Sequence, residues 1–155
     1  MKHATGFAVI LALSVILAAA VANAEPQKPR PLKVTASSTQ VIQLDAQGQP
    51  GEAHAAAVGF ATHLGLVVMT GTADYRTPAP GTGYIVAANG DFLTMVFYPT
   101  GPTTIETVIT GGVGRFEGAK GHFTITVQIL SQELDPTNGT VTLKMSWQGK
   151  GEIEF

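Results

Sequence analysis

VTLKMSWQ, at residues 141–148, decides the fold of this chain, because apolar and polar residues alternate through it without a break. Successive side chains of a β-strand point to opposite faces of the sheet, so one set of these side chains is buried and the other is wet. The apolar set continues at Ile153 and Phe155. Gly149 and Gly151 interrupt it, and we interpret them as a bend or bulge where a barrel turns a corner.

The preceding segment has the same alternation, and its predicted buried face carries Phe123, Ile125, Val127 and Ile129. Residues 135–139, with the sequence DPTNG, supply the turn between these two strands. A second hairpin is predicted over residues 84–93, because Asn89-Gly90 tolerates the two positive φ angles of a type I′ turn. Hairpins of this kind join neighbouring antiparallel strands.

The rest of the chain follows the same pattern. From residue 32 onward, no ten-residue window places apolar residues at helical spacing, whereas β-branched and aromatic residues alternate with polar ones between glycine clusters. We expect about eight strands, near residues 33–44, 53–61, 64–75, 83–88, 91–98, 103–110, 121–131 and 139–155. Closure removes the edges that an open sheet exposes. The sequence therefore predicts an all-β domain, a single eight-stranded antiparallel up-and-down barrel.

The amino-terminal residues predict a cleaved signal peptide over residues 1–24. An apolar run from Phe7 to Val21 follows Lys2 and precedes the small-x-small sequence Ala-Asn-Ala at 22–24. The run is shorter than the roughly 18 residues that span a bilayer, so we expect no membrane anchor after processing. The protein is therefore expected to be exported, either periplasmic or secreted.

Residues 25–31 carry three prolines and are expected to form an extended Pro-rich tether, which leaves residues 32–155 as the barrel domain. The chain has no cysteine, so its stability must come from packing and hydrogen bonds without disulfides.

Composition argues against several classes of partner and cofactor. The formal net charge is −2, and no basic patch is present to attract nucleic acid. The histidines form no H-x-H or H-x-x-x-H pair, so no metal site is predicted. No serine lies in a nucleophile elbow, and a cysteine nucleophile is impossible. We expect no cofactor.

The segment GGVGRFEGAKG, at residues 111–121, has the glycines of a phosphate-binding loop but not its pattern. Glu117 stands where a dinucleotide motif needs its third glycine, and the segment leads into a strand instead of a helix. We interpret it as a corner between strands, with Phe116 in the core and glycines at positive φ. The structural glycines of this corner are Gly111, Gly112, Gly114, Gly118 and Gly121.

Two ionisable residues are the candidates for catalysis if the barrel is an enzyme. Glu106 lies in a segment whose two faces are both apolar, so it points either inward, where it would serve proton transfer or hold a polar ligand group, or outward into water. His63, within residues 61–65, is either a general base or a hydrogen-bonded structural histidine.

The glycine segment resembles the G-G-x-G-x-F-x-G-x-x-G corner of the barrel family that contains plant allene oxide cyclases and dirigent proteins. Residues 61–65 and 87–91 are similar to small exported bacterial members of that family. The resemblance implies a calycin-like barrel that holds a small apolar molecule, and a homo-oligomer, frequently a trimer in plant members. The cyclases act on a fatty-acid epoxide and dirigent proteins steer phenoxy-radical coupling, but their catalytic residues lie outside the shared corner.

Three functions therefore stay open at this point. The leading hypothesis is an exported barrel that binds a small, largely apolar molecule, with Trp147, Phe116 and Tyr84 as candidate ligand-binding residues. The second is a cofactor-free isomerase or cyclase that uses Glu106 or His63. The third is a structural or protein-interaction barrel of the cell envelope.

Overall fold

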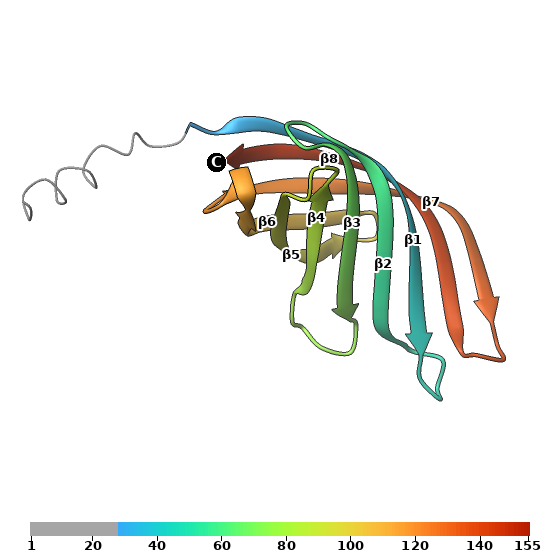
Figure 1. Ribbon diagram of the computed structural model, residues 1–155. Helices are drawn as coiled ribbons and strands as arrows, with labels where there is room; N and C mark the ends of the chain where they lie inside the picture. Colours follow the sequence, from blue (N-terminus) through green and yellow to red (C-terminus); the bar gives the residue numbers. More distant parts are fainter. Residues whose placement is uncertain (1–27) are drawn as a thin grey trace, which may run out of the picture.

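The computed structural model describes residues 28–155 as one barrel of eight strands with one short 3-10 helix. The expected signal peptide and residues 25–27 of the expected tether lie outside the described residues. In chain order the elements are β1 (Arg30–Leu44), β2 (Pro50–Ala61), β3 (Gly65–Asp74), β4 (Gly81–Ala87), β5 (Phe92–Gly101), β6 (Thr104–Val113), η1 (Gly114–Phe116), β7 (Lys120–Asp135) and β8 (Thr140–Glu154) (Figure 1). Within residues 28–155, no helix is long and apolar enough to cross a membrane.

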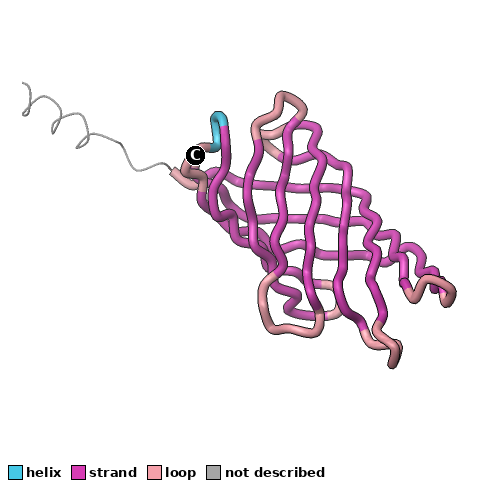
Figure 2. The backbone as a smooth tube through the Cα atoms, turned by 60° about the horizontal axis from the view of Figure 1, so that its bottom comes forward, coloured by secondary structure: helices cyan, strands magenta, loops and turns pink. Residues whose placement is uncertain are grey.

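The strands close into a barrel in simple sequence order. Each strand pairs antiparallel with the next, and β8 returns to pair with β1 along nearly its whole length. Figure 2 shows the resulting lattice of strands, with loops at both ends. The predicted all-β, eight-stranded antiparallel up-and-down barrel is confirmed.

Several strands extend three or four residues beyond the ranges expected from the sequence, and two of these extensions matter for the ends of the barrel. β1 begins at Arg30, so Arg30 and Pro31 of the expected tether pair with β8. Proline is tolerated here because the pairing of β1 with β2 starts only at Val34, opposite Ala61, and Pro31 faces one neighbouring strand instead of two. β7 runs on to Asp135, beyond the expected end at residue 131.

The turn at Asn89-Gly90 is in the expected place but is not of the expected type. Gly90 has a φ of +90°, whereas Asn89 has no positive φ. Gly90 N donates to Ala87 O at 3.0 Å and Ala87 N to Asp91 O at 2.8 Å, which closes a three-residue loop with glycine in the left-handed position. The prediction of a type I′ turn is wrong because the Asn89 side chain is engaged with Asp91, through Nδ2 to Oδ2 at 2.8 Å.

Strand parity sets the core. On β7 the predicted inward residues Phe123, Ile125 and Val127 are 1%, 4% and 8% exposed, as expected. Ile129, opposite Met145, keeps this inward parity and lines the interior, but it is 50% exposed because the interior is open to solvent at its level. β7 bulges after it, before Ser131. Each large apolar side chain that is fully buried contributes roughly 1.5–3 kcal/mol.

One end of the barrel, which we call the plugged end, is filled by aromatic side chains. Phe116 is fully buried, and its ring meets Phe155 edge-on with the centroids 4.8 Å apart. Arg115 lies over Phe116 at 4.8 Å and Arg30 over Phe155 at 4.6 Å. These cation–π contacts cover the aromatic pair from the solvent side. Arg115 also pairs with Asp91 at 3.3 Å.

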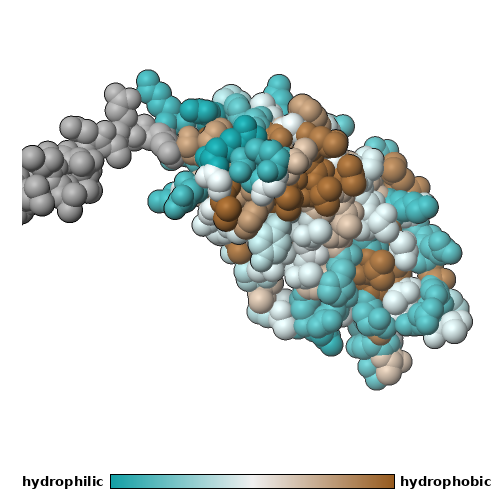
Figure 3. Space-filling model, in the orientation of Figure 1, coloured by the Kyte–Doolittle hydropathy of each residue, from teal (hydrophilic) through white to brown (hydrophobic). Residues whose placement is uncertain are grey.

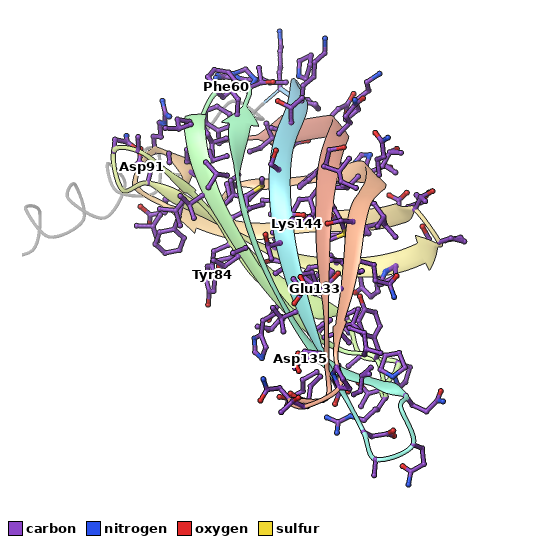
Figure 4. The ribbon with its side chains drawn as sticks, turned by 90° about the vertical axis from the view of Figure 1, so that its right-hand side faces the viewer. Phe60, Tyr84, Asp91, Glu133, Asp135 and Lys144 are labelled. Atoms are coloured by element: carbon purple, nitrogen blue, oxygen red, sulfur yellow. The ribbon has the colours of Figure 1, made fainter. Side chains whose placement is uncertain are left out.

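The opposite end, which we call the open end, is built differently. β1, β2, β7 and β8 have 12 to 16 residues, whereas β3 to β6 have 7 to 10, so the long strands project past the short ones (Figure 1). On the projecting part of β7, Leu130 and Leu134 are 60% and 58% exposed. Figure 4 places Asp135 at this end and Asp91 and Phe60 toward the other.

The outer surface of β2 to β6 carries an apolar belt. Cross-strand pairing aligns Val58 with Val68, Val68 with Val86, Val86 with Phe92, and Phe92 with Val113. Phe60, Leu66 and Tyr84 extend this row, and Figure 3 shows apolar side chains gathered over β3 and β4. Outward valine and phenylalanine in one row leave a broad apolar surface in contact with water.

Candidate functional site

The open end contains a cavity of about 240 Å³. Inward residues of every strand except β4 line it, and its large apolar side chains include Met69, Met95, Phe97, Ile125, Met145 and Trp147. Ala53, Ala55 and Ala73 supply only methyl groups on the facing wall, on β2 and β3. β2 has only alanine and glycine at its inward positions, and on β3 the inward residues change from Val67 and Met69 to Gly71 and Ala73 toward the open end, which leaves space there.

β4 does not line the cavity because two side chains of β5 lie across its glycines. A Cβ on Gly81 would overlap the ring of Phe97, and a Cβ on Gly83 would come within 2.9 Å of the terminal methyl of Met95. The absence of side chains at these inward positions lets Phe97 and Met95 lie flat against β4. This packing forms one side of the cavity wall.

Polar groups border the mouth. Gln40 on β1 donates through Nε2 to the Tyr75 hydroxyl at 3.0 Å, and both residues line the cavity. Pro99, Pro102 and Thr103 line it from the end of β5 and the turn that follows. Tyr75 is 44% exposed, so the cavity reaches the solvent at this rim.

The described cavity wall has no acidic, basic or histidine side chain among residues 28–155. The same part of the chain has no group of three His, Cys, Asp or Glu residues that could hold a metal ion. A charged ligand group in this cavity would lose its hydration without gaining an opposite charge. The wall therefore favours a neutral ligand.

Two aspartates, Asp74 and Asp135, end β3 and β7 at the open end. Arg76 hydrogen-bonds Asp74 through Nε at 2.8 Å and Nη2 at 2.9 Å, and these bonds lower the pKa of Asp74. Asn138 donates to Asp135 through Nδ2 at 2.7 Å, which lowers the pKa of the Asp135 carboxyl. These carboxylates hold the turns after β3 and β7.

Three buried polar atoms have no hydrogen-bond partner within residues 28–155: Ser38 Oγ, Thr107 Oγ1 and Trp147 Nε1. All three residues are on inward positions of their strands, and Thr107 and Trp147 line the cavity. Buried polar groups in folded proteins are nearly always paired, so these three atoms mark the part of the interior with unused hydrogen-bonding capacity.

Of the three candidate ligand-binding residues, only Trp147 lines the cavity. Phe116 belongs to the plugged end, where Phe155 and Arg115 cover it. Tyr84 has outward parity on β4 and is 51% exposed, with its ring edge-on to Phe92, and Figure 4 shows it pointing away from the barrel.

The two catalytic candidates lie outside the cavity. Glu106 is on the outer face of β6, where both its carboxylate oxygens accept from Thr124 Oγ1, at 2.9 and 3.0 Å. The structure selects the other face, that of Ile105, Thr107 and Ile109, as the interior. His63 is in the β2–β3 turn at the plugged end, with a φ of 71° and Nε2 bonded to Pro31 O at 3.0 Å.

The glycine corner lies at the plugged end. Gly114, Gly118 and Gly121 have φ values of +71°, +74° and +155°, while Gly111 and Gly112 have no positive φ. Gly112 is required for another reason, because a Cβ there would come within 2.8 Å of Phe116 Cβ. The corner thus lets η1 press Phe116 into the core and takes no part in the cavity wall.

Sequence reasoning missed Thr107, Ser38, Met69, Met95 and Phe97 as inward residues; it placed Met145 on a buried face but did not identify it as part of a site. Parity would have grouped Thr107 with Ile105 and Ile109 had the inner face of that strand been known. Both faces of residues 104–110 carry apolar residues, so the sequence offered no signal to choose between them.

Fold and site together define an eight-stranded antiparallel barrel with an uncharged, mostly apolar cavity at one end. No known family matches the chain, and no curated protein does. Among solved structures, the chain is similar to the pterocarpan synthase dirigent protein GePTS1, with 13% identity over 100% of this chain and 99% of that one and a TM-score of 0.43. The pterocarpan synthase dirigent protein PsPTS1 has 14% identity over 81% and 96%, with a TM-score of 0.37. A similarity of this size to the two dirigent proteins does not indicate a shared activity.

Proposed function

We propose that this protein is an exported barrel that binds a small, largely apolar molecule in its interior. The observation that carries the proposal is the cavity of about 240 Å³ at the open end, with its uncharged wall. An eight-stranded barrel is just wide enough either to be filled by its own side chains or to hold one small ligand. This barrel is filled at its plugged end and leaves space at its open end.

The size and apolar wall of the cavity favour binding of a ligand. The cavity opens to solvent at its rim, and a ligand that covers its apolar wall removes that surface from water, which contributes roughly 25 cal/mol per Å² buried. A cavity on the order of 150 Å³ holds one benzene ring, so this one has room for a bicyclic skeleton of about ten heavy atoms. The methionines in the wall adapt to ligands of different shape because their side chains are unbranched and flexible.

Within residues 28–155, the cavity wall contains no acidic, basic or histidine side chain that could act as the proton donor or acceptor of an isomerase or cyclase. A proton transfer inside the cavity needs a group that titrates near neutral pH, and the described wall has none. The Glu106 carboxylate accepts a hydrogen bond from Thr124, and His63 Nε2 bonds Pro31 O, both outside the cavity.

Co-purification with matched variants tests the proposal. Protein expressed from the full-length chain is extracted, and small molecules are identified by mass spectrometry. Ala55→Phe fills the cavity, while Ala56→Phe places the same ring on the exposed face of the same strand. We expect a neutral apolar compound with wild type and with Ala56→Phe, and none with Ala55→Phe. Equal recovery from both variants, or an interior without ligand in all three, contradicts the proposal.

The outer belt supports a second proposal, that the protein forms a homo-oligomer. The aligned row from Val58 across to Val113 contains no acidic or basic side chain, so it offers no charge by which to select a different partner. Two copies of one uncharged apolar surface are complementary in an isologous contact. Light scattering on the purified protein should give a multiple of the chain mass, and Val68→Lys should reduce it to a monomer; a monomeric wild type contradicts the proposal.

A further inference from the structure

Two exposed turns of the barrel contain the sequence Asn-Gly, at Asn89-Gly90 after β4 and at Asn138-Gly139 after β7. Both glycines are in the left-handed region, with φ values of +90° and +62°. An asparagine before glycine is prone to ring closure, because glycine has no side chain to hinder attack by its backbone nitrogen on the preceding side-chain amide. The two turns share this reactive pair, and they differ in how its atoms are hydrogen-bonded.

The turn at Asn89 holds each atom that ring closure uses. Gly90 N, the attacking nitrogen, donates to Ala87 O at 3.0 Å. The Asn89 side chain donates through Nδ2 to Asp91 Oδ2 at 2.8 Å and accepts through Oδ1 from Asp91 N at 3.2 Å. Ring closure at this turn would break all of these hydrogen bonds.

The turn at Asn138 holds the same atoms less firmly. Asn138 Nδ2 donates to Asp135 Oδ2 at 2.7 Å, which fixes one end of the side-chain amide. Within residues 28–155, neither Gly139 N nor Asn138 Oδ1 has a hydrogen-bond partner. The attacking nitrogen and the oxygen of the carbonyl under attack are both free.

We propose that Asn138 is a site of spontaneous conversion to isoaspartate in the folded protein, whereas Asn89 is protected. Gly139 N bonds to Asn138 Cγ, the Cγ–Nδ2 bond breaks, and the amide nitrogen leaves as ammonia with the proton from Gly139 N. Water then opens the cyclic imide at the main-chain carbonyl of Asn138. The product has a free carboxylate at that carbon and a backbone that continues through Cγ, and water is the co-reactant.

The conversion alters the contacts that dock this turn on the end of β1. Leu44 N donates to Gly139 O at 2.8 Å, and Gln43 Nε2 donates to Asn138 O at 3.2 Å. Isoaspartate lengthens the backbone between Asn138 and Gly139, turns the Asn138 carbonyl into a carboxylate and removes the amide that donates to Asp135. The new negative charge also lies beside the Asp135 carboxylate and repels it. We therefore expect the converted turn to separate from β1.

Peptide mapping by mass spectrometry tests the site. The purified protein is stored at mildly alkaline pH, folded in one series and unfolded in urea in the other, and an isoaspartate-specific carboxyl methyltransferase distinguishes isoaspartate from aspartate. In the folded protein we expect Asn138 to convert severalfold faster than Asn89, and in urea we expect the two rates to be similar. Asn138→Gln is the matched control, because its longer side chain closes a ring far more slowly, and it should remove most of the methyl-accepting signal from the folded protein.

Asn89 converting as fast as Asn138 in the folded protein overturns the proposal. A preference for Asn138 that is equally large in urea also overturns it, since the local sequence would then explain the difference without the hydrogen bonds. Hydrogen exchange tests the structural consequence: the Leu44 amide should lose protection in the converted protein and keep it in the stored Asn138→Gln variant. Unchanged protection of Leu44 after conversion contradicts the separation of the turn from β1.

Discussion

The plugged end and the open end of this barrel are made from the same eight strands but solve the packing of the interior in different ways. At the plugged end Phe116, Phe155 and Leu64 fill the space, and two arginines cover the rings. At the open end β3 has Gly71 and Ala73 at inward positions, opposite the inward alanines of β2, and no aromatic pair fills the space, so a cavity results. The packed end therefore contributes most to the stability of the barrel, whereas the interior of the open end has room for a ligand.

The turns at the two ends of the barrel are also held by different residues. At the plugged end, the corner after β6 is fixed by glycines and by the buried ring of Phe116. At the open end, Asp45, Asp74 and Asp135 cap their turns by accepting backbone N–H bonds, for example from Gln47 N to Asp45 at 2.9 Å. An aspartate side chain that accepts backbone N–H groups in this way favours the turn without a glycine.

The largest expected effect comes from one substitution made at each end. Phe116→Ala removes a fully buried ring and should lower the free energy of unfolding by about 3–5 kcal/mol. Phe97→Ala removes a ring that already borders a cavity, so it leaves less new empty surface and should cost about 2 kcal/mol or less. Urea unfolding of the two variants measures both values, and equal losses would break the distinction between the ends.

A smaller effect is expected within the glycine corner. Gly114 and Gly118 both have left-handed φ, but a Cβ on Gly114 would overlap the Asp91 carboxylate, whereas a Cβ on Gly118 meets no atom within 4 Å. Gly118→Ala should therefore cost only the backbone strain, about 1–2 kcal/mol. Gly114→Ala should cost at least about 1 kcal/mol more, because Asp91 must leave Arg115.

Thermal or urea unfolding of the two glycine variants tests this ranking. The double variant Gly114→Ala with Asp91→Ala is informative, since removing the carboxylate should bring the Gly114→Ala cost, measured against Asp91→Ala alone, down to that of Gly118→Ala. A Gly118→Ala variant less stable than Gly114→Ala would show that the corner is not held by the Asp91 contact.

The smallest expected effect concerns acid. The pKa values of Asp74 and Asp135 are lowered by hydrogen bonds from Arg76 and Asn138, so both contribute stability that is complete above the unfolded-state pKa of about 3.9 and is lost as pH falls through the lower folded pKa. Amide protection in the turns at 74–77 and 135–139 should decline below about pH 4. NMR titration of the two carboxyl groups measures this, and a folded pKa at or above that of an unfolded aspartate would contradict it.

Much of the fold was predictable because β parity is a local property. The inward positions of Phe123 and Met145 follow from alternation alone, and the turn at 135–139 follows from its Asp, Pro, Asn and Gly residues. The type of turn at Asn89 was not predictable in this way, since the loop length depends on the side-chain bond between Asn89 and Asp91.

The cavity could not be predicted because it depends on residues distant in sequence. Ala55 and Gly71 look like ordinary strand residues, and only the fold shows which larger side chains reach across them. Phe97 lies over Gly71 and Gly81, and it lines the cavity together with the alanines of β2. Trp147 was identified from parity, whereas the outward face of Glu106 required the strand pairing of β6.

The central claim, that the interior is filled at one end and accessible at the other, is tested most directly by a crystal structure of the protein under xenon pressure. Xenon enters apolar cavities that have room for it. We predict xenon among Met69, Met95 and Trp147 at the open end, and none beside Phe116 at the plugged end. Xenon in the plugged end, or an open end closed over by its own side chains, would contradict the account.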